Sequence, residues 1–193
     1  MAVDPRDIKL PAYIAVVLSS IALILACIGV GTPSWQVTYS DAPTNTIPSG
    51  STNFYYSCSA SNATCTNSKY STDSYIHLRL ASGLAIVGIL FIFFGTVGTY
   101  MIAISPFDGS SNIKDIRYRD MNLGFGPLCL FIGTITMLAA LAEGSKTILY
   151  NGYSANLYQT AHILAIFSLL TSAYASGRRS LLDDPTMEQP LLK

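Results

Sequence analysis

The sequence predicts an all-α membrane protein: a bundle of four transmembrane helices with a small β-sheet outside the membrane. Two observations predict it. Half of the 193 residues are hydrophobic and only 11% are charged, against about 25% charged residues in an average soluble domain. Four stretches of the chain also contain no Asp, Glu, Lys or Arg, and each has the roughly 20 residues that a helix needs to cross a hydrocarbon core. We therefore expect one four-pass domain over residues 1–193.

The four uncharged stretches are residues 12–31, 80–104, 123–142 and 157–176. Lipid offers no hydrogen-bond partners to the backbone, so each stretch is expected to be a helix. None has the two-residue alternation of a membrane β-barrel. The first stretch has an alternative interpretation as a cleaved signal peptide, because Arg6 and Lys9 precede it. Its apolar length exceeds that of a signal sequence, which favours a retained first helix.

The distribution of Lys and Arg predicts the orientation. Eight of the eleven lie before the first stretch, between the second and third, or after the fourth, and in a four-pass chain these segments share one side. Cytoplasmic segments are enriched in Lys and Arg. We expect both termini to be cytosolic, with a cytosolic tail at 177–193 and two outer loops at 32–78 and 143–156.

The first outer loop contains segments typical of strands. Residues 34–40 and 53–58 are rich in aromatic and β-branched side chains. Residues 41–52 are polar and contain two prolines and a glycine, which predicts a connecting loop. In the second outer loop, residues 147–150 could add an edge strand. Trp35 follows the first helix closely, so an interfacial aromatic belt is an alternative explanation for it.

Two cysteines close the first outer loop's aromatic segment. On an extracytoplasmic side, Cys58 and Cys65 are expected to form a disulfide, with free thiols as the alternative. Cross-linking so short a loop stabilises the folded state by about 2.5 kcal/mol on the chain-entropy model. Between them, Asn62 begins the only Asn-x-Ser/Thr sequon of the chain and is a candidate glycosylation site. Two thiolates alone cannot complete a metal site, so no metal is expected.

One charged residue stands at the entry to the second predicted helix. Arg79 can extend its side chain to the interface and so avoid the cost of a charge in the membrane centre. Glu143, at the end of the third predicted helix, lies at the matching depth. We therefore expect Glu143 as a possible counter-charge to Arg79.

The sequence argues against several classes of function. Eleven basic and eleven acidic residues create no overall field for nucleic acid. No cluster combines a nucleophile with a base, a set of metal ligands or a phosphate-binding loop. We expect no enzyme, no cofactor and no small-molecule substrate.

The order of motifs resembles the superfamily of claudins, peripheral myelin proteins and calcium-channel γ-subunits. In that superfamily the first outer loop carries a Trp, then Gly/Asn-Leu-Trp-x-x-Cys, a second Cys and an Arg at the entry to helix two. The matching residues here are Trp35, Asn53, Cys58, Cys65 and Arg79. Phe54 and Tyr55 stand where the superfamily has Leu-Trp, and the spacing of the cysteines is shorter than in claudins.

The resemblance implies a small antiparallel sheet on the outer leaflet, built mainly from the first loop with one strand from the second. It also implies a structural or adhesive role in the plasma membrane, at cell–cell contacts or in lateral assemblies. The expected partners are the lipid bilayer, copies of the same chain and other membrane proteins. The alternative that the resemblance implies is an auxiliary regulatory or trafficking subunit of another membrane protein, such as an ion channel.

Overall fold

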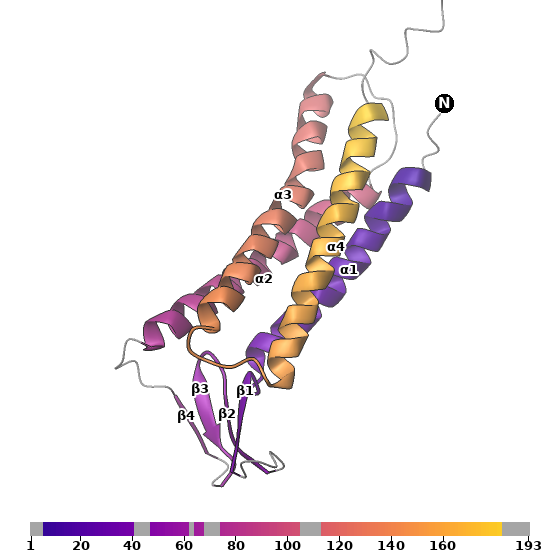
Figure 1. Cartoon of the computed structure of the whole chain (residues 1–193). Coiled ribbons are helices and arrows are strands. Elements are labelled where there is room, and N and C mark those ends of the chain that lie inside the picture. Colours follow the sequence, from indigo (N-terminus) through magenta and orange to yellow (C-terminus); the bar gives the residue numbers. More distant parts are fainter. Residues whose placement is uncertain (1–5, 41–46, 62–63, 68–73, 105–112, 183–193) are drawn as a thin grey trace, which may run out of the picture.

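Four long helices form the body of the protein in the computed structural model, which describes residues 6–40, 47–61, 64–67, 74–104 and 113–182. The helices are α1 (Arg6–Gly31), α2 (Ser74–Ile104), α3 (Ile113–Gly144) and α4 (Tyr153–Leu182). α1 packs against α2 and α4, and α3 packs against the same two helices, so the four form a closed ring (Figure 1). The mostly helical fold class predicted from the sequence is confirmed.

Each uncharged stretch lies inside one helix. The parts long and apolar enough to cross a membrane are Lys9–Gly31, Ile76–Ile104, Leu123–Gly144 and Tyr153–Ser180. All four helices extend beyond the expected boundaries: α1 begins at Arg6 and α2 at Ser74, both before the expected start, α3 begins at Ile113, in a segment expected to be a loop, and α4 continues to Leu182, into the expected tail. Lys and Arg are good helix formers, so the backbone hydrogen bonds continue past the end of the apolar sequence.

Small residues let the helices approach closely. A Cβ atom added at Gly98 of α2 would lie 2.9 Å from Cα of Gly126 of α3, and one added at Gly95 would lie 2.7 Å from Leu130. Where lipid supplies no hydrophobic drive, such close packing gains dispersion contacts between helices. At these glycines α2 and α3 therefore approach each other closely.

Buried hydroxyl groups add hydrogen bonds between helices. The Ser168 hydroxyl of α4 donates to the carbonyl oxygen of Ala15 in α1 at 2.8 Å. Thr99 of α2 and Ser172 of α4 share a hydrogen bond of 2.8 Å, and both side chains are fully buried. These bonds join α4 to α1 and to α2.

We expect Gly126→Ala to weaken the contact between α2 and α3. Its Cβ would lie 2.9 Å from the backbone nitrogen of Thr99, so the helices must separate, at a cost of about 1–3 kcal/mol. Gly124→Ala is the matched control, because a Cβ there meets nothing within 4 Å. Thermal unfolding in detergent measures both variants, and an equal melting temperature for the two would contradict the close packing.

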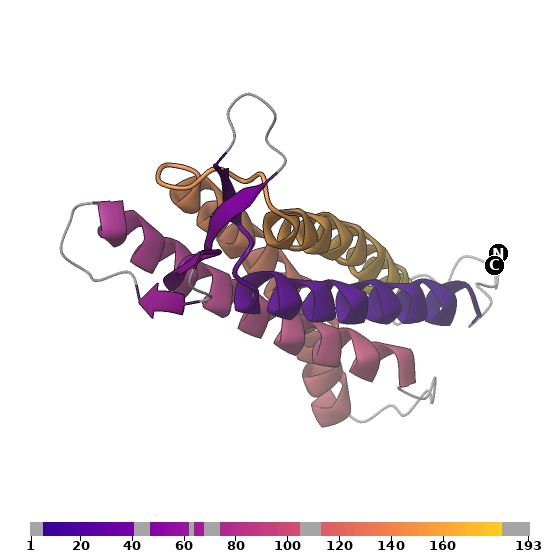
Figure 2. The same cartoon turned by 90° about the horizontal axis from the view of Figure 1, so that it is seen from below.

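The sheet is a four-stranded antiparallel meander in the order β1-β2-β3-β4. Its strands are β1 (Gln36–Tyr39), β2 (Pro48–Thr52), β3 (Tyr56–Ser59) and β4 (Thr64–Asn67). It lies below the end of the bundle where α1 ends and α4 begins (Figures 1 and 2). The start of α1 at Arg6 and the end of α4 at Leu182 lie at the opposite end of the bundle. The antiparallel sheet implied by the resemblance is thus present.

Two expectations about strands are wrong. β2 lies within residues 41–52, which were expected to form a loop. Its side chains are exposed or half-buried, so pairing with β1 and β3 holds this strand, and no apolar alternation marks it in the sequence. Residues 147–150 form no strand; side chains instead connect this part of the chain to β1.

Candidate functional site: the joint between sheet and helices

The sheet is attached to the helices by an aromatic cluster, which we call the joint: Trp35, Phe54, Tyr150 and Tyr158. The Trp35 side chain is fully buried. Its ring centroid lies 4.2 Å from that of Phe54 and 5.4 Å from that of Tyr158. Trp35 therefore packs inside the protein, and the interpretation as an interfacial aromatic belt is wrong.

A hydrogen bond fixes the orientation of the Trp35 ring. Nε1 of Trp35 donates to the carbonyl oxygen of Gly29 at 2.7 Å. Gly29 lies in the last turn of α1, where carbonyl groups lack partners within the helix. The indole thus ties the start of the sheet to the end of the helix that precedes it.

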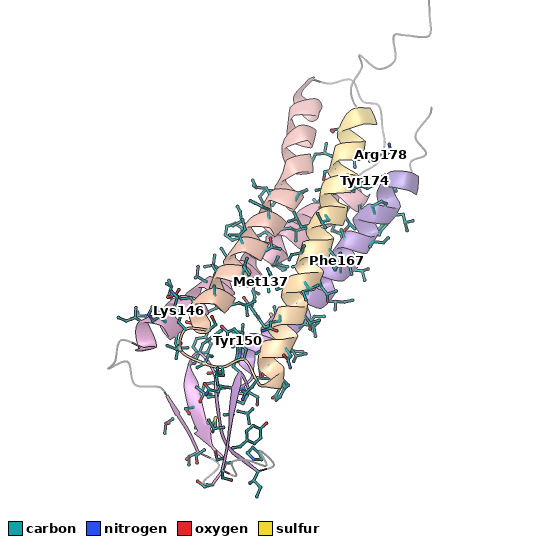
Figure 3. The ribbon with its side chains drawn as sticks, viewed as in Figure 1. Met137, Lys146, Tyr150, Phe167, Tyr174 and Arg178 are labelled. Carbon is teal, nitrogen blue, oxygen red and sulfur yellow. A yellow bond between two sulfur atoms is a disulfide. The ribbon has the colours of Figure 1, made fainter. Side chains whose placement is uncertain are left out.

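Tyr150 brings the segment between α3 and α4 into the joint. Its ring lies edge-on to Trp35 at 5.3 Å, and its hydroxyl donates to the carbonyl oxygen of Leu141 in α3 at 2.6 Å. Figure 3 shows Tyr150 between the helix ends and the sheet, on the segment that joins α3 to α4. Burial raises the pKa of the Tyr150 phenol, so the hydroxyl keeps the proton that it donates.

Asn53 forms the turn between β2 and β3. Its Oδ1 accepts hydrogen bonds from the backbone nitrogens of Tyr55 at 2.7 Å and Tyr56 at 2.9 Å. Its Nδ2 donates to the carbonyl oxygen of Thr32 at 3.4 Å. An asparagine side chain that caps its own turn in this way stabilises a sharp change of direction, and here it aims Phe54 at Trp35.

Phe54 and Tyr55 have different surroundings. Phe54 is buried against Trp35, and a Cβ at Gly144 would lie 2.8 Å from the Phe54 ring, so the end of α3 packs tightly on it. Tyr55 is half-buried and packs against the same core. Both side chains at the position where the superfamily has Leu-Trp therefore contribute to the apolar interior.

The edge of β1 is bound by the segment between α3 and α4 and by the start of α4. The Asn151 side chain accepts a hydrogen bond from the Val37 backbone nitrogen at 2.7 Å and donates one to the Val37 carbonyl oxygen at 2.9 Å. Gly152 donates its backbone N–H to the carbonyl oxygen of Trp35 at 3.0 Å, and Ser154 donates to that of Ser34 at 3.1 Å. We call these contacts the clasp. The Asn151 amide replaces the backbone of an additional strand.

The expected disulfide is present. Cys58 and Cys65 are directly opposite each other in β3 and β4, with their Cα atoms 4.0 Å apart. The bond links the last strand of the meander to its neighbour. Asn62, the candidate glycosylation site, lies outside the described residues.

We expect Cys58→Ser to reduce delivery of the protein to the cell surface. The variant loses the cross-link of an eight-residue loop, worth about 2.5 kcal/mol, and leaves Cys65 with a free thiol. Surface biotinylation measures the effect, with Cys27→Ser as control, because Cys27 is an exposed free cysteine in α1. Wild-type surface levels of Cys58→Ser would contradict a structural role for the disulfide.

Glu143 has two partners that the sequence did not indicate. Its carboxylate contacts Nδ1 of His77 at the start of α2, and it accepts a hydrogen bond from Lys146 at 2.7 Å. Arg79 is exposed on α2. Both carboxylate oxygens of Glu143 are thus engaged, and the contact with His77 joins α2 to α3; the pairing of Glu143 with Arg79 stays a prediction.

Sequence reasoning missed three contributors to the site: Tyr150, Tyr158 and the clasp residue Asn151. Tyr158 lies in the first turns of α4, inside a predicted helix, so nothing distinguished it from ordinary packing. Asn151-Gly152 was visible as a turn signal, but the bond from Asn151 to Val37 spans 114 residues. Spacing along the chain cannot reveal such a contact.

Within the described part of the chain, no three His, Cys, Asp or Glu side chains come together as metal ligands. A scan against protein-family models and a search of curated proteins match this chain to no family and no relative. The site is thus defined by its own geometry: a four-helix body, with four candidate membrane-spanning helices, that holds a small sheet at one end.

Proposed function

We propose that this chain is a structural, claudin-like four-pass protein of the plasma membrane, whose sheet associates with copies of itself in the same membrane or at cell–cell contacts. One observation carries the proposal: buried contacts to three helices hold the sheet in place, while the residues of its strands stay exposed or half-buried. The Trp35 ring contacts Tyr158 of α4, its indole nitrogen binds Gly29 of α1, and Tyr150 binds Leu141 of α3. A sheet held in this way can present a constant surface to a partner.

The charge distribution supports an outward orientation of the sheet. At the opposite end of the bundle lie Lys9, Arg178 and Arg179, together with the basic first turns of α3. The enrichment of Lys and Arg on the cytoplasmic side then supports a cytosolic location for both termini. A disulfide at the sheet end is consistent with an oxidising compartment outside.

The surface of the sheet favours an uncharged partner. The four strands contain no Asp, Glu, Lys or Arg and are rich in Ser and Thr. Tyr39 at the end of β1 is 41% exposed, and the neighbouring Ile47 is 56% exposed. Contacts through such a surface depend on apolar burial and neutral hydrogen bonds, so salt should screen them little.

Imaging of cells that express the chain tests this proposal. Freeze-fracture electron microscopy should show clusters or continuous strands where two expressing cells meet. Tyr39→Arg should disperse them because it places a charge on the neutral sheet, whereas Tyr39→Phe should preserve them. A diffuse surface signal, together with a co-purifying channel, would overturn the proposal and support an auxiliary subunit.

The orientation has a separate test. If the sheet end is outside the cell, Asn62 enters the secretory lumen, and an antibody tag inserted beside Ser61 should be stained on intact cells. A tag at Lys193 should be stained only after permeabilisation. The reverse pattern would place the sheet in the cytosol and contradict the proposed role at cell surfaces.

A further inference from the structure

We propose that Asn151-Gly152 is a deamidation site that the clasp protects. Conversion of Asn151 to Asp or isoaspartate during a transient opening would prevent the clasp from forming again. The inference does not depend on the proposed function. It rests on an Asn-Gly dipeptide, the only one in the chain, whose side chain and backbone both bind the edge of β1.

The chemistry belongs to the dipeptide itself. The backbone nitrogen of Gly152 attacks Cγ of Asn151, a new C–N bond forms, and the bond from Cγ to Nδ2 breaks. Ammonia leaves with the proton that Gly152 carried. Water then opens the cyclic imide at either carbonyl, which leaves Asp or isoaspartate at position 151. Glycine has no side chain to hinder the attack, and its backbone is conformationally permissive.

In the folded protein the clasp opposes this reaction. Two hydrogen bonds to Val37, of 2.7 and 2.9 Å, hold the Asn151 side chain. The backbone nitrogen of Gly152 must lose its proton before it can attack. Its N–H is held in a hydrogen bond to the carbonyl oxygen of Trp35, at 3.0 Å. Gly152 is also buried, and a Cβ there would lie 1.9 Å from the Ser34 carbonyl oxygen. This backbone therefore has no room to rotate toward the side chain.

The product cannot restore the clasp. An ionised Asp still accepts from the Val37 nitrogen, but it has no proton to donate to the Val37 oxygen. Two oxygen acceptors would then face each other where Nδ2 now donates. Isoaspartate also lengthens the backbone, which displaces the Gly152 and Ser154 N–H groups from their acceptors on the first loop. Isoaspartate therefore detaches the segment between α3 and α4 from β1, and Asp weakens its attachment there.

Val37→Pro tests the protection. Both polar backbone atoms of Val37 point to Asn151, away from β2, and proline is tolerated at such an outward position of an edge strand. The variant removes the Val37 N–H and loosens the clasp. Val37→Ala is the matched control, because it keeps the N–H and shortens only the side chain.

The full-length chain, purified in lipid nanodiscs, is incubated at mildly alkaline pH and followed by peptide mass spectrometry. Conversion at Asn151 should be several-fold faster in Val37→Pro than in wild type or Val37→Ala. Asn156, exposed in the first turn of α4 and followed by Leu157, serves as the internal reference and should react equally in all three. Equal rates at Asn151 in all three proteins would overturn the proposal.

Two further variants keep the proposal testable. If Val37→Pro loses the burial of Trp35, Gln36→Ala is used instead: it removes the acceptor on β1 for the N–H of Leu149, two residues before Asn151, so it should loosen the clasp and speed conversion at Asn151 without changing the backbone of Val37. Asn151→Asp tests the second half of the inference. It should increase hydrogen exchange at Gly152 and Ser154 without changing that of the helix cores, and wild-type protection in this variant would show that the product does not open the clasp.

Discussion

Trp35→Ala is expected to detach the sheet from the helix bundle. The substitution removes a fully buried indole, and truncations of this size cost about 3–5 kcal/mol. It also removes the donor to the Gly29 carbonyl oxygen and leaves Phe54 and Tyr150 facing a cavity. The equilibrium between the docked and detached sheet should shift by roughly a hundredfold or more.

Hydrogen exchange of the purified chain measures this shift. The N–H groups of Gly152 and Ser154, bonded to Trp35 and Ser34, should lose most of their protection, while the centres of the four helices should keep theirs. Trp35→Phe is the matched control, because it retains an aromatic ring and loses the indole N–H, so its effect should be intermediate. If the alanine variant exchanged like wild type, the joint would not be what holds the sheet.

The helices could be predicted because their signal is local. A run of about 20 uncharged residues requires a helix in lipid whatever the rest of the chain does. Their exact ends could not be predicted, since α3 begins at Ile113 and α4 ends at Leu182 within charged sequence. There the helix continues through backbone hydrogen bonds, which leave no mark on the pattern of hydrophobic residues.

The sheet was predictable only in part. The strand-like character of residues 34–40 anticipated β1, and the cysteines anticipated the disulfide. β2 was missed because Pro48–Thr52 is polar on both faces; its position depends on its neighbours and not on burial. The clasp was missed for the same reason: the Asn151 side chain, not an apolar strand, binds the backbone of Val37.

Trp35 was singled out from the sequence, but its surroundings were not. Its neighbours come from the turn at Phe54, the segment at Tyr150 and the start of α4 at Tyr158. Only the first of these belongs to the motif that resembles the claudin superfamily. The other two are tyrosines in ordinary apolar contexts, and only the folding of the chain brings them to the indole.

Gly152→Ala is expected to open the clasp while leaving every polar side chain in place. A Cβ at this position would lie 1.9 Å from the Ser34 carbonyl oxygen and 2.6 Å from its carbon. Both are backbone atoms, so no side-chain rotation relieves the overlap and the segment must move away from β1. Overpacking typically costs about 1–3 kcal/mol, and a clash with fixed backbone belongs at the upper end of that range.

Trp35 itself reports the result, because it is the only tryptophan in the chain. Loss of the Gly152 hydrogen bond to Trp35 and displacement of Tyr150 should expose the indole, shift its fluorescence to longer wavelength and admit a water-soluble quencher. Gly31→Ala is the matched control, since Gly31 also lies at the sheet end and a Cβ there meets nothing within 4 Å. Its emission should equal that of wild type. If Gly152→Ala also kept the wild-type emission, the sheet would be held by the aromatic cluster alone and the clasp would contribute nothing to the joint.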